Sequence, residues 1–88
     1  MIERPLELVN ERGLHARAAA RFVKLVGSFS SKVTVTKDGT TVSGSSIMGL
    51  MMLAAATGSF ITVAVEGPDE AAAAEAIAAL VSGGFDEA

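Results

Sequence analysis

The dipeptide Asp38-Gly39 separates two short segments in which apolar and polar residues alternate. In the segment 32–36, Val33 and Val35 occupy every second position, which places both side chains on one face of a strand. Asp-Gly is a strong signal for a tight turn between strands, since such a turn requires positive φ angles that glycine adopts without strain. The sequence therefore predicts a β-hairpin with strands at 32–36 and 40–43.

Two further segments show the alternation of half-buried strands. Along residues 2–9 the alternation is imperfect, and Pro5, which has no backbone N–H to donate, favours an edge strand or an early position in a strand. Residues 60–66 alternate again. The side chains expected on the buried faces are Ile2, Leu6 and Leu8 in the first segment and Ile61, Val63 and Val65 in the second.

Three other segments have the spacing of helices. The first spans 16–26, the second begins at Ile47 after a serine cap, and the third follows Asp69, its expected N-cap. Gly83-Gly84 ends the third helix and leaves 85–88 as a tail. Core positions are expected at Ala19, Phe22, Val23, Val26, Leu50, Leu53, Ala73, Ile77, Leu80 and Val81. The order βαββαβα predicts an α+β fold, with helices on one face of a mostly antiparallel sheet.

Composition limits the classes of protein to which this chain can belong. Its 88 residues suffice for one domain, which we expect to span 1–88. Without cysteine there is no disulfide or thiolate metal site, and a net charge of −3 argues against a general nucleic-acid surface. The start, Met-Ile-Glu-Arg-Pro, lacks the features of a signal peptide, and the apolar run 47–56 is too short to cross a bilayer. We therefore expect a soluble cytoplasmic domain.

The only histidine, His15, stands immediately before the first predicted helix. A zinc site is a poor interpretation, because zinc needs four ligands and the chain offers one imidazole and no thiolate. A Ser-His-Asp hydrolase is also poor, because no nucleophile-elbow motif is present and so small a core leaves no deep pocket. Two interpretations remain for His15, an exposed loop residue or a nucleophile for phosphoryl transfer.

Phosphoryl transfer would give each group around His15 a function. Neutral imidazole can attack phosphorus directly. The helix N-terminus would offer N–H groups and a positive dipole end to the negatively charged product. Arg17, two residues further on, would donate hydrogen bonds to the phosphoryl oxygens.

The stretch Gly13-Leu14-His15-Ala16-Arg17 resembles the active-site motif of HPr, the histidine phosphocarrier family of the bacterial phosphoenolpyruvate-dependent phosphotransferase system. A second block, Ser45-Ser46-Ile47-Met48-Gly49-Leu50-Met51, is similar to that family's regulatory serine and the short helix after it. The spacing between the blocks also fits, and the likeness covers nearly the whole chain. The resemblance implies the family's open-faced β-sandwich, four strands with three helices on one side.

The resemblance also implies roles and partners. His15 would accept a phosphoryl group at Nδ1 from enzyme I and pass it to a histidine or cysteine of an enzyme II component such as enzyme IIA, with Arg17 as its electrostatic partner. The protein would be a stoichiometric carrier, not an enzyme, without a cofactor or metal. It would be a monomer that reaches membrane transport only through partners. The family usually has proline after the arginine, whereas this chain has Ala18, so the first helical turn is less pre-organised. Arg12 has no assigned family role.

Ser46 has a structural and a functional interpretation. Its position predicts the N-cap of the helix that starts at Ile47. By resemblance it would be the site modified by an HPr kinase/phosphorylase, with Ser45 and Ser43 as alternatives. The exposed part of this helix and the basic side of the first helix predict a surface for docking partners, here called the docking face. Its expected members are Arg21, Lys24, Ile47, Met48 and Met51.

Alternatives remain for the docking face and for the function. Arg21 and Lys24 could belong only to a solvated helix face. The chain could instead be a carrier of the nitrogen-related regulatory branch of the family, or a catalytically silent binding module of the same fold. The presence of both His15 and Arg17 argues against the silent module.

Overall fold

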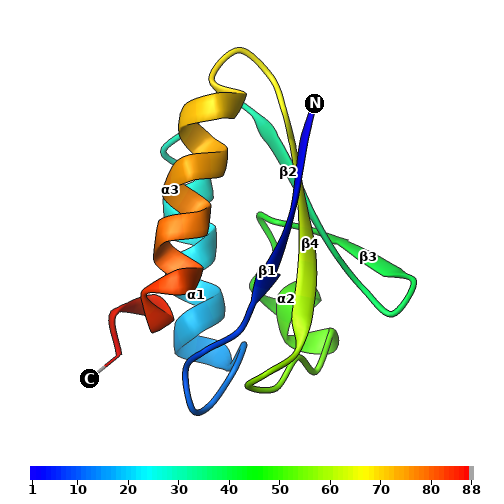
Figure 1. Cartoon of the computed structure of the whole chain (residues 1–88). Coiled ribbons are helices and arrows are strands. Elements are labelled where there is room, and N and C mark those ends of the chain that lie inside the picture. The colour runs from blue at the N-terminus through cyan, green and yellow to red at the C-terminus, as the bar shows by residue number, and fades with distance from the viewer. Residues whose placement is uncertain (88) are drawn as a thin grey trace.

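The computed structural model describes residues 1–87 and confirms the predicted order of strands and helices (Figure 1). The elements are β1 (Ile2–Glu7), α1 (Ala16–Val26), β2 (Lys32–Lys37), β3 (Thr40–Ser43), α2 (Ile47–Met52), β4 (Phe60–Glu66), α3 (Glu70–Ser82) and a 3₁₀ turn (Gly84–Asp86), called the C-terminal turn below. The first strand is shorter than predicted and ends at Glu7, although the Leu8 N–H still donates to the Ser59 carbonyl over 2.9 Å.

The four strands form one sheet in the order β1-β4-β2-β3, and each neighbouring pair is antiparallel. β1 lies at an edge, so Pro5, which pairs with Thr62, has a neighbouring strand on one side only. Asp38 and Gly39 both have positive φ angles, 49° and 81°, as the predicted hairpin turn requires. The structure therefore confirms the predicted antiparallel sheet, the edge position of Pro5 and the tight turn at Asp38-Gly39.

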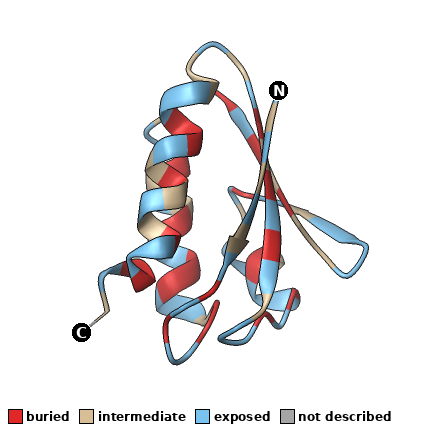
Figure 2. Ribbon diagram, viewed as in Figure 1, coloured by how far each residue is buried: buried red, intermediate tan, exposed pale blue. Residues whose placement is uncertain are grey.

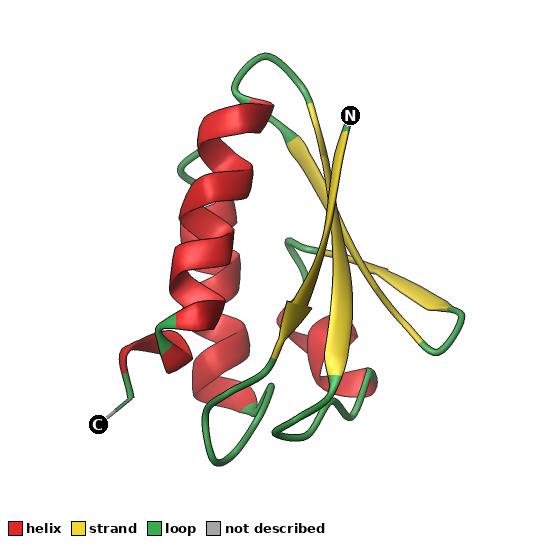
Figure 3. Cartoon of the chain, in the orientation of Figure 1, coloured by secondary structure: helices red, strands yellow, loops and turns green. Residues whose placement is uncertain are grey.

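The helices all lie on one face of the sheet (Figure 3). α1 and α3 run side by side, while α2 contacts α1 and β3. Buried residues line the sides of the helices that face the sheet, and the opposite face of the sheet stays open (Figure 2). The residue pattern predicted an α+β fold with helices on one face of the sheet, and the resemblance implied an open-faced sandwich; the structure confirms both. None of the helices in residues 1–87 has the length and apolarity needed to cross a membrane.

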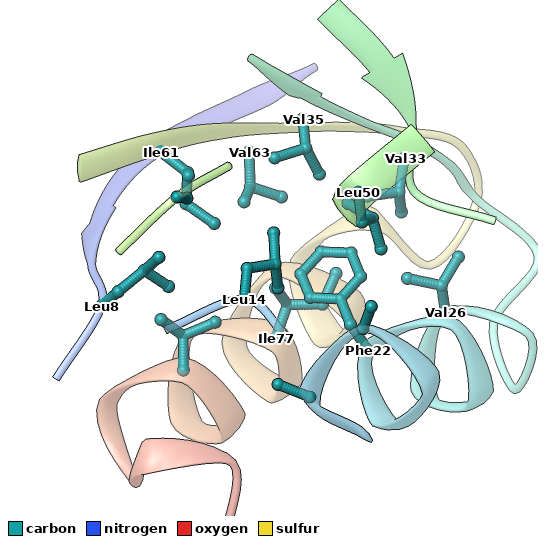
Figure 4. Packing of buried hydrophobic residues seen from close by; sticks show 14 of the residues in the cluster. Leu8, Leu14, Phe22, Val26, Val33, Val35, Leu50, Ile61, Val63 and Ile77 are labelled. Atoms are coloured by element: carbon teal, nitrogen blue, oxygen red, sulfur yellow. The ribbon is translucent and has the colours of Figure 1, made fainter. Parts of the chain in front are cut away.

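The core fills the space between this sheet face and the helices (Figure 4). Phe22 of α1 and Ile77 of α3 meet strand residues such as Val63 there, and all three are almost completely buried. The predicted core positions are buried except Val23 and Leu80 of the helices and Ile2 and Leu6 of β1, which are half-buried. Leu50 and Leu53 both belong to the core, as predicted.

The prediction of a C-terminal tail is wrong for the described residues. Phe85 is completely buried and belongs to the core cluster. Gly84 and Phe85 have φ angles of 68° and 58°, which turn the chain back against the end of α3. The apolar area that Phe85 removes from water stabilises this turn. The last residue of the predicted tail, Ala88, lies outside the described residues.

Asp69 occupies the predicted N-cap position of α3, but its side chain does not cap that helix. Its carboxylate accepts from the Ser30 backbone N–H over 2.8 Å and from the Ser31 hydroxyl. These hydrogen bonds, led by the one from Ser31, hold the pKa of the Asp69 carboxyl below its usual value. Asp69 therefore ties the start of α3 to the loop before β2.

Candidate functional site

A tightly held loop carries the chain from β1 to His15. The Leu14 N–H donates to the Ala55 carbonyl over 2.9 Å, and the Leu14 side chain is buried in the core. Gly13 has a φ of 62°, and its carbonyl accepts from the Asn10 side-chain amide over 2.8 Å. The backbone just before His15 is thus anchored both to the core and to the loop after α2.

His15 is the N-cap residue of α1, with an extended backbone at φ −81° and ψ 179°. Its carbonyl accepts the first helical hydrogen bond, from Ala19 over 2.8 Å, but its side chain does not cap the helix. The first turn of α1 contains no acidic residue, and Arg17 in that turn is exposed. The positive end of the helix dipole and a guanidinium therefore lie next to the imidazole.

The imidazole of His15 lines an open cleft of about 710 Å³ between the start of α1 and the end of α3. Arg12, Arg17 and Arg21 line the same cleft, so three guanidinium groups border it. Arg12, which the resemblance left without a role, thus belongs to the site. Guanidinium groups and a helix N-terminus favour a doubly charged anion such as a phosphoryl group.

Glu87 is a residue of this cleft that the sequence did not reveal. Its Oε2 contacts His15 Nε2, and its Oε1 accepts from Asn10 Nδ2 over 2.9 Å. The hydrogen bond from Asn10, followed by that from His15, lowers the pKa of the Glu87 carboxyl. His15 is consequently half-buried, whereas one interpretation of the sequence made it an exposed loop residue. No motif signals the contact, because the two residues are 72 positions apart.

Arg21 and Lys24 differ in their surroundings, although both were assigned to the docking face. Arg21 is half-buried, and its guanidinium donates to the Phe85 carbonyl of the C-terminal turn. Lys24 is exposed in the last turn of α1. Together with Leu25, Ser28, Leu80 and Asp86, the two basic residues line a second, smaller hollow. Arg21 thus has a structural contact that Lys24 lacks in the described part of the chain.

Ser46 caps α2, as predicted. Its backbone is extended, and its Oγ accepts from the Gly49 N–H over 2.9 Å. Ser45 is exposed, and its N–H donates to the Ser43 hydroxyl over 3.1 Å. Of the three serines, Ser46 is therefore the one at the helix N-terminus.

The exposed side of α2 is apolar. Met48 is 72% exposed, whereas Met51 and Ile47 are 42% and 40% exposed. Met52, which was not assigned to the docking face, is 77% exposed and extends this surface. α2 contacts α1, so the apolar surface adjoins the helix that carries Arg17 and Lys24. Flexible methionine side chains suit a surface that binds other proteins.

Within residues 1–87, no three His, Cys, Asp or Glu side chains are grouped so that they could hold a metal ion.

Comparison with known proteins identifies this arrangement. Residues 2–83 match the family model described as the PTS HPr component phosphorylation site. Phosphocarrier protein HPr of Neisseria meningitidis serogroup A is 47% identical over 87 residues, which cover 99% of this chain and 98% of the relative. Phosphocarrier protein NPr of Shewanella violacea is 40% identical, with 99% and 96% covered.

A solved structure agrees with these relatives. The crystal structure of HPr-C-His from Thermoanaerobacter tengcongensis superposes with a TM-score of 0.95 at 41% identity, covering 100% of this chain and 99% of that one. The sequence matches and the shared fold lead to one conclusion: the chain belongs to the HPr family of phosphocarrier proteins of the phosphotransferase system.

Proposed function

We propose that His15 accepts a phosphoryl group derived from phosphoenolpyruvate from phospho-enzyme I and passes it to an enzyme IIA component. The observation that carries this proposal is the position of His15, at the N-terminus of α1 and in a cleft bordered by Arg12, Arg17 and Arg21. The protein then acts as a stoichiometric carrier and needs no cofactor, since the donor supplies the phosphoryl group and the partner removes it.

The transfer step forms one bond and breaks one. The lone pair of His15 Nδ1 attacks phosphorus, and the bond from phosphorus to the donor atom breaks, with its electron pair leaving on the donor. Arg17 and the N–H groups at the start of α1 stabilise the charge on the phosphoryl oxygens. Transfer to enzyme IIA is the same step in reverse, with the partner's nucleophile attacking the phosphoryl group on His15.

Partners dock on the surface next to His15 in this proposal. The docking face combines the apolar side chains of α2 with basic residues of α1: Arg21, Lys24, Ile47, Met48 and Met51. Phosphorylation of Ser46 by an HPr kinase/phosphorylase would place a dianion beside that apolar surface and weaken the binding of an acidic partner. We also propose that residues 1–88 work as one domain, as a monomer and in the cytoplasm, which light scattering and cell fractionation test.

The direct test is incubation with enzyme I and phosphoenolpyruvate, followed by intact mass. We expect a gain of one phosphoryl group that is labile in acid and stable in base. His15→Ala should gain none, and its circular dichroism and melting curve should show whether it remains folded without the contact to Glu87. Lys32→Ala is the control and should gain one phosphoryl group, because Lys32 is exposed on β2 and does not line the cleft. Full phosphorylation of folded His15→Ala would refute the proposal.

The second candidate is a carrier in the nitrogen-related branch of the family. Relatives named HPr and NPr match this chain with 47% and 40% identity, so similarity alone does not select one branch. Phosphorylated protein should be offered separately to an enzyme IIA of sugar transport and to one of the nitrogen-related branch. The partner that removes the phosphoryl group faster identifies the branch. A silent binding module would fail at the first step, because His15 would gain no phosphoryl group.

A further inference from the structure

The last described residues of the chain close over one side of the imidazole. In Figure 1 the red C-terminal segment lies beside the lower end of α1, where that helix begins. Phe85 is completely buried, and its carbonyl accepts from the Arg21 guanidinium. The Glu87 N–H donates to the Gly84 carbonyl over 3.1 Å. These contacts hold the backbone of Glu87 in place next to His15.

The Glu87 carboxylate uses both of its oxygens inside the site. Oε1 accepts from Asn10 Nδ2 over 2.9 Å, and Oε2 contacts His15 Nε2. Asn10 is itself fixed, because it is only 6% exposed and its Nδ2 also donates to the Gly13 carbonyl over 2.8 Å. Since both partners of Nδ2 are acceptors, the amide orientation is determined by its contacts. The side chain of Glu87 is thus oriented by the same loop that carries His15.

A carboxylate accepts hydrogen bonds and does not donate them, so this contact requires the hydrogen of the imidazole to be on Nε2. From this geometry we propose that Glu87 is a positioning residue that holds His15 in the Nε2–H tautomer and leaves the lone pair of Nδ1 to attack phosphorus. The consequence for transfer rests on the proposed function of His15. The tautomer itself is a property of the unphosphorylated protein.

Glu87 would also act while the phosphoryl group is transferred. When Nδ1 bonds to phosphorus, the ring keeps its Nε2–H and acquires positive charge, and no proton has to leave. The carboxylate beside Nε2 stabilises that charge. The arginines Arg12, Arg17 and Arg21 line the same cleft and suit the phosphoryl oxygens. The Glu87 carboxylate would therefore stabilise the positive charge on the ring of phosphorylated His15, and the arginines would stabilise the negative charge on its phosphoryl oxygens.

Two other acids line the cleft, Glu11 and Asp86. Both are exposed, and among residues 1–87 neither has a hydrogen bond or ion pair to His15. Asp86 directly precedes Glu87 and has a φ of 61°, a conformation that asparagine tolerates. Asp86→Asn therefore removes one negative charge from the same cleft while leaving the contact to His15 intact, which makes it the matched control.

The tautomer is tested by ¹⁵N NMR of the imidazole in the unphosphorylated protein, with the ring in its neutral form. In the wild type and in Asp86→Asn we expect a hydrogen on Nε2 that exchanges slowly with water. Glu87→Ala should lose this slow exchange. In Glu87→Gln the amide oxygen can still accept from Nε2–H, so the tautomer should be retained. A hydrogen on Nδ1 in the wild type, or unchanged exchange in Glu87→Ala, would overturn the positioning role.

Transfer kinetics separate positioning from charge stabilisation. Both Glu87→Gln and Glu87→Ala lose the carboxylate charge beside Nε2, so each should slow transfer from phospho-enzyme I about tenfold or more. Asp86→Asn should transfer at the wild-type rate. If both Glu87 variants matched the wild type, the stabilising role would be refuted. If the wild type itself gained no phosphoryl group, the proposed function would fail, whereas the NMR result would still decide the tautomer.

Discussion

Gly13 lies directly against the carbonyl of Ala55: a Cβ at position 13 would stand 2.4 Å from the Ala55 oxygen. The neighbouring Leu14 N–H donates to that same oxygen over 2.9 Å. The loop before α1 is therefore seated on the loop after α2. The contact joins the sequence block around His15 to the segment that follows the second block and α2.

Gly13→Ala should destabilise the fold and disturb transfer. The substitution combines a positive φ with a clash against backbone, so we expect a loss of about 2–4 kcal/mol in the free energy of unfolding. Gly39→Ala is the control, because φ at 39 is also positive but a Cβ there meets nothing within 4 Å. It should lose about 1–2 kcal/mol. Urea unfolding of both variants measures the difference, and equal losses would show that the contact with Ala55 is unimportant.

Arg17→Ala should impair transfer and leave stability nearly unchanged. Arg17 is exposed, so the free energy of unfolding should change by no more than about 0.5 kcal/mol. A lost charge-assisted hydrogen bond to the phosphoryl group should cost about 1.5–3 kcal/mol in the transfer step, or about tenfold to hundredfold in rate. Rapid-quench kinetics with phospho-enzyme I check this. Wild-type rates would mean that the guanidinium has no part in the chemistry.

Changes on the docking face should weaken partner binding without unfolding the protein. Lys24→Glu should slow association with enzyme I and flatten its dependence on salt, since exposed charges act mainly on the association rate. Met48→Asp should raise the dissociation constant. Lys32→Glu, an exposed charge reversal on β2, is the control. Arg21 is less suitable for this test, because it also holds the C-terminal turn. If Lys24→Glu and Met48→Asp bind like Lys32→Glu, partners dock elsewhere.

Substitutions at Ser46 should separate its two roles. Ser46→Ala removes the hydrogen bond to the Gly49 N–H and should cost about 0.5–2 kcal/mol of stability. Ser46→Asp keeps a cap and adds negative charge at the helix N-terminus, so it should fold normally. It should nevertheless accept phosphoryl groups more slowly, mostly through weaker binding, because the charge adjoins the apolar surface of α2.

Melting curves and transfer assays at several protein concentrations test both Ser46 variants. Ser45→Asp is the control for added charge at an exposed serine that does not cap α2. Normal transfer by Ser46→Asp would leave Ser46 as a helix cap alone.

The Asp69 carboxylate should make stability depend on acid pH. Its pKa is lowered from 3.8 in the folded protein, chiefly by the Ser31 hydroxyl. The stabilisation is therefore complete above the unfolded-state pKa and is lost as pH falls below 3.8 through the folded-state pKa. Asp69→Asn should lose less stability than the wild type between neutral pH and about pH 3. Urea midpoints across that range test this, with the exposed Asp38→Asn as control. Parallel curves for all three proteins would contradict it.

The sequence by itself determined the elements and their faces. The alternation in β2 and β4, the Asp38-Gly39 turn and the Ser46 cap are local features, because strand period, turn conformation and capping depend on residues within a few positions of one another. The position of His15 at the start of α1 was predictable for the same reason. Local patterns of this kind also carried the resemblance to the family around His15 and Ser46.

Only the tertiary structure decided what surrounds His15. Phe85 follows a pair of glycines and has no periodic neighbours, so nothing local indicated that it would be buried or that it would bring Glu87 to the imidazole. Nor did anything local indicate that the Asp69 carboxylate would accept hydrogen bonds from Ser30 and Ser31 and would not cap its own helix. Both outcomes depend on segments far apart in sequence that meet only when the core forms. Whether an apolar side chain is buried, and where a polar group finds its hydrogen-bond partner, depends on tertiary contacts. The spacing of residues within one helix or strand therefore does not predict either.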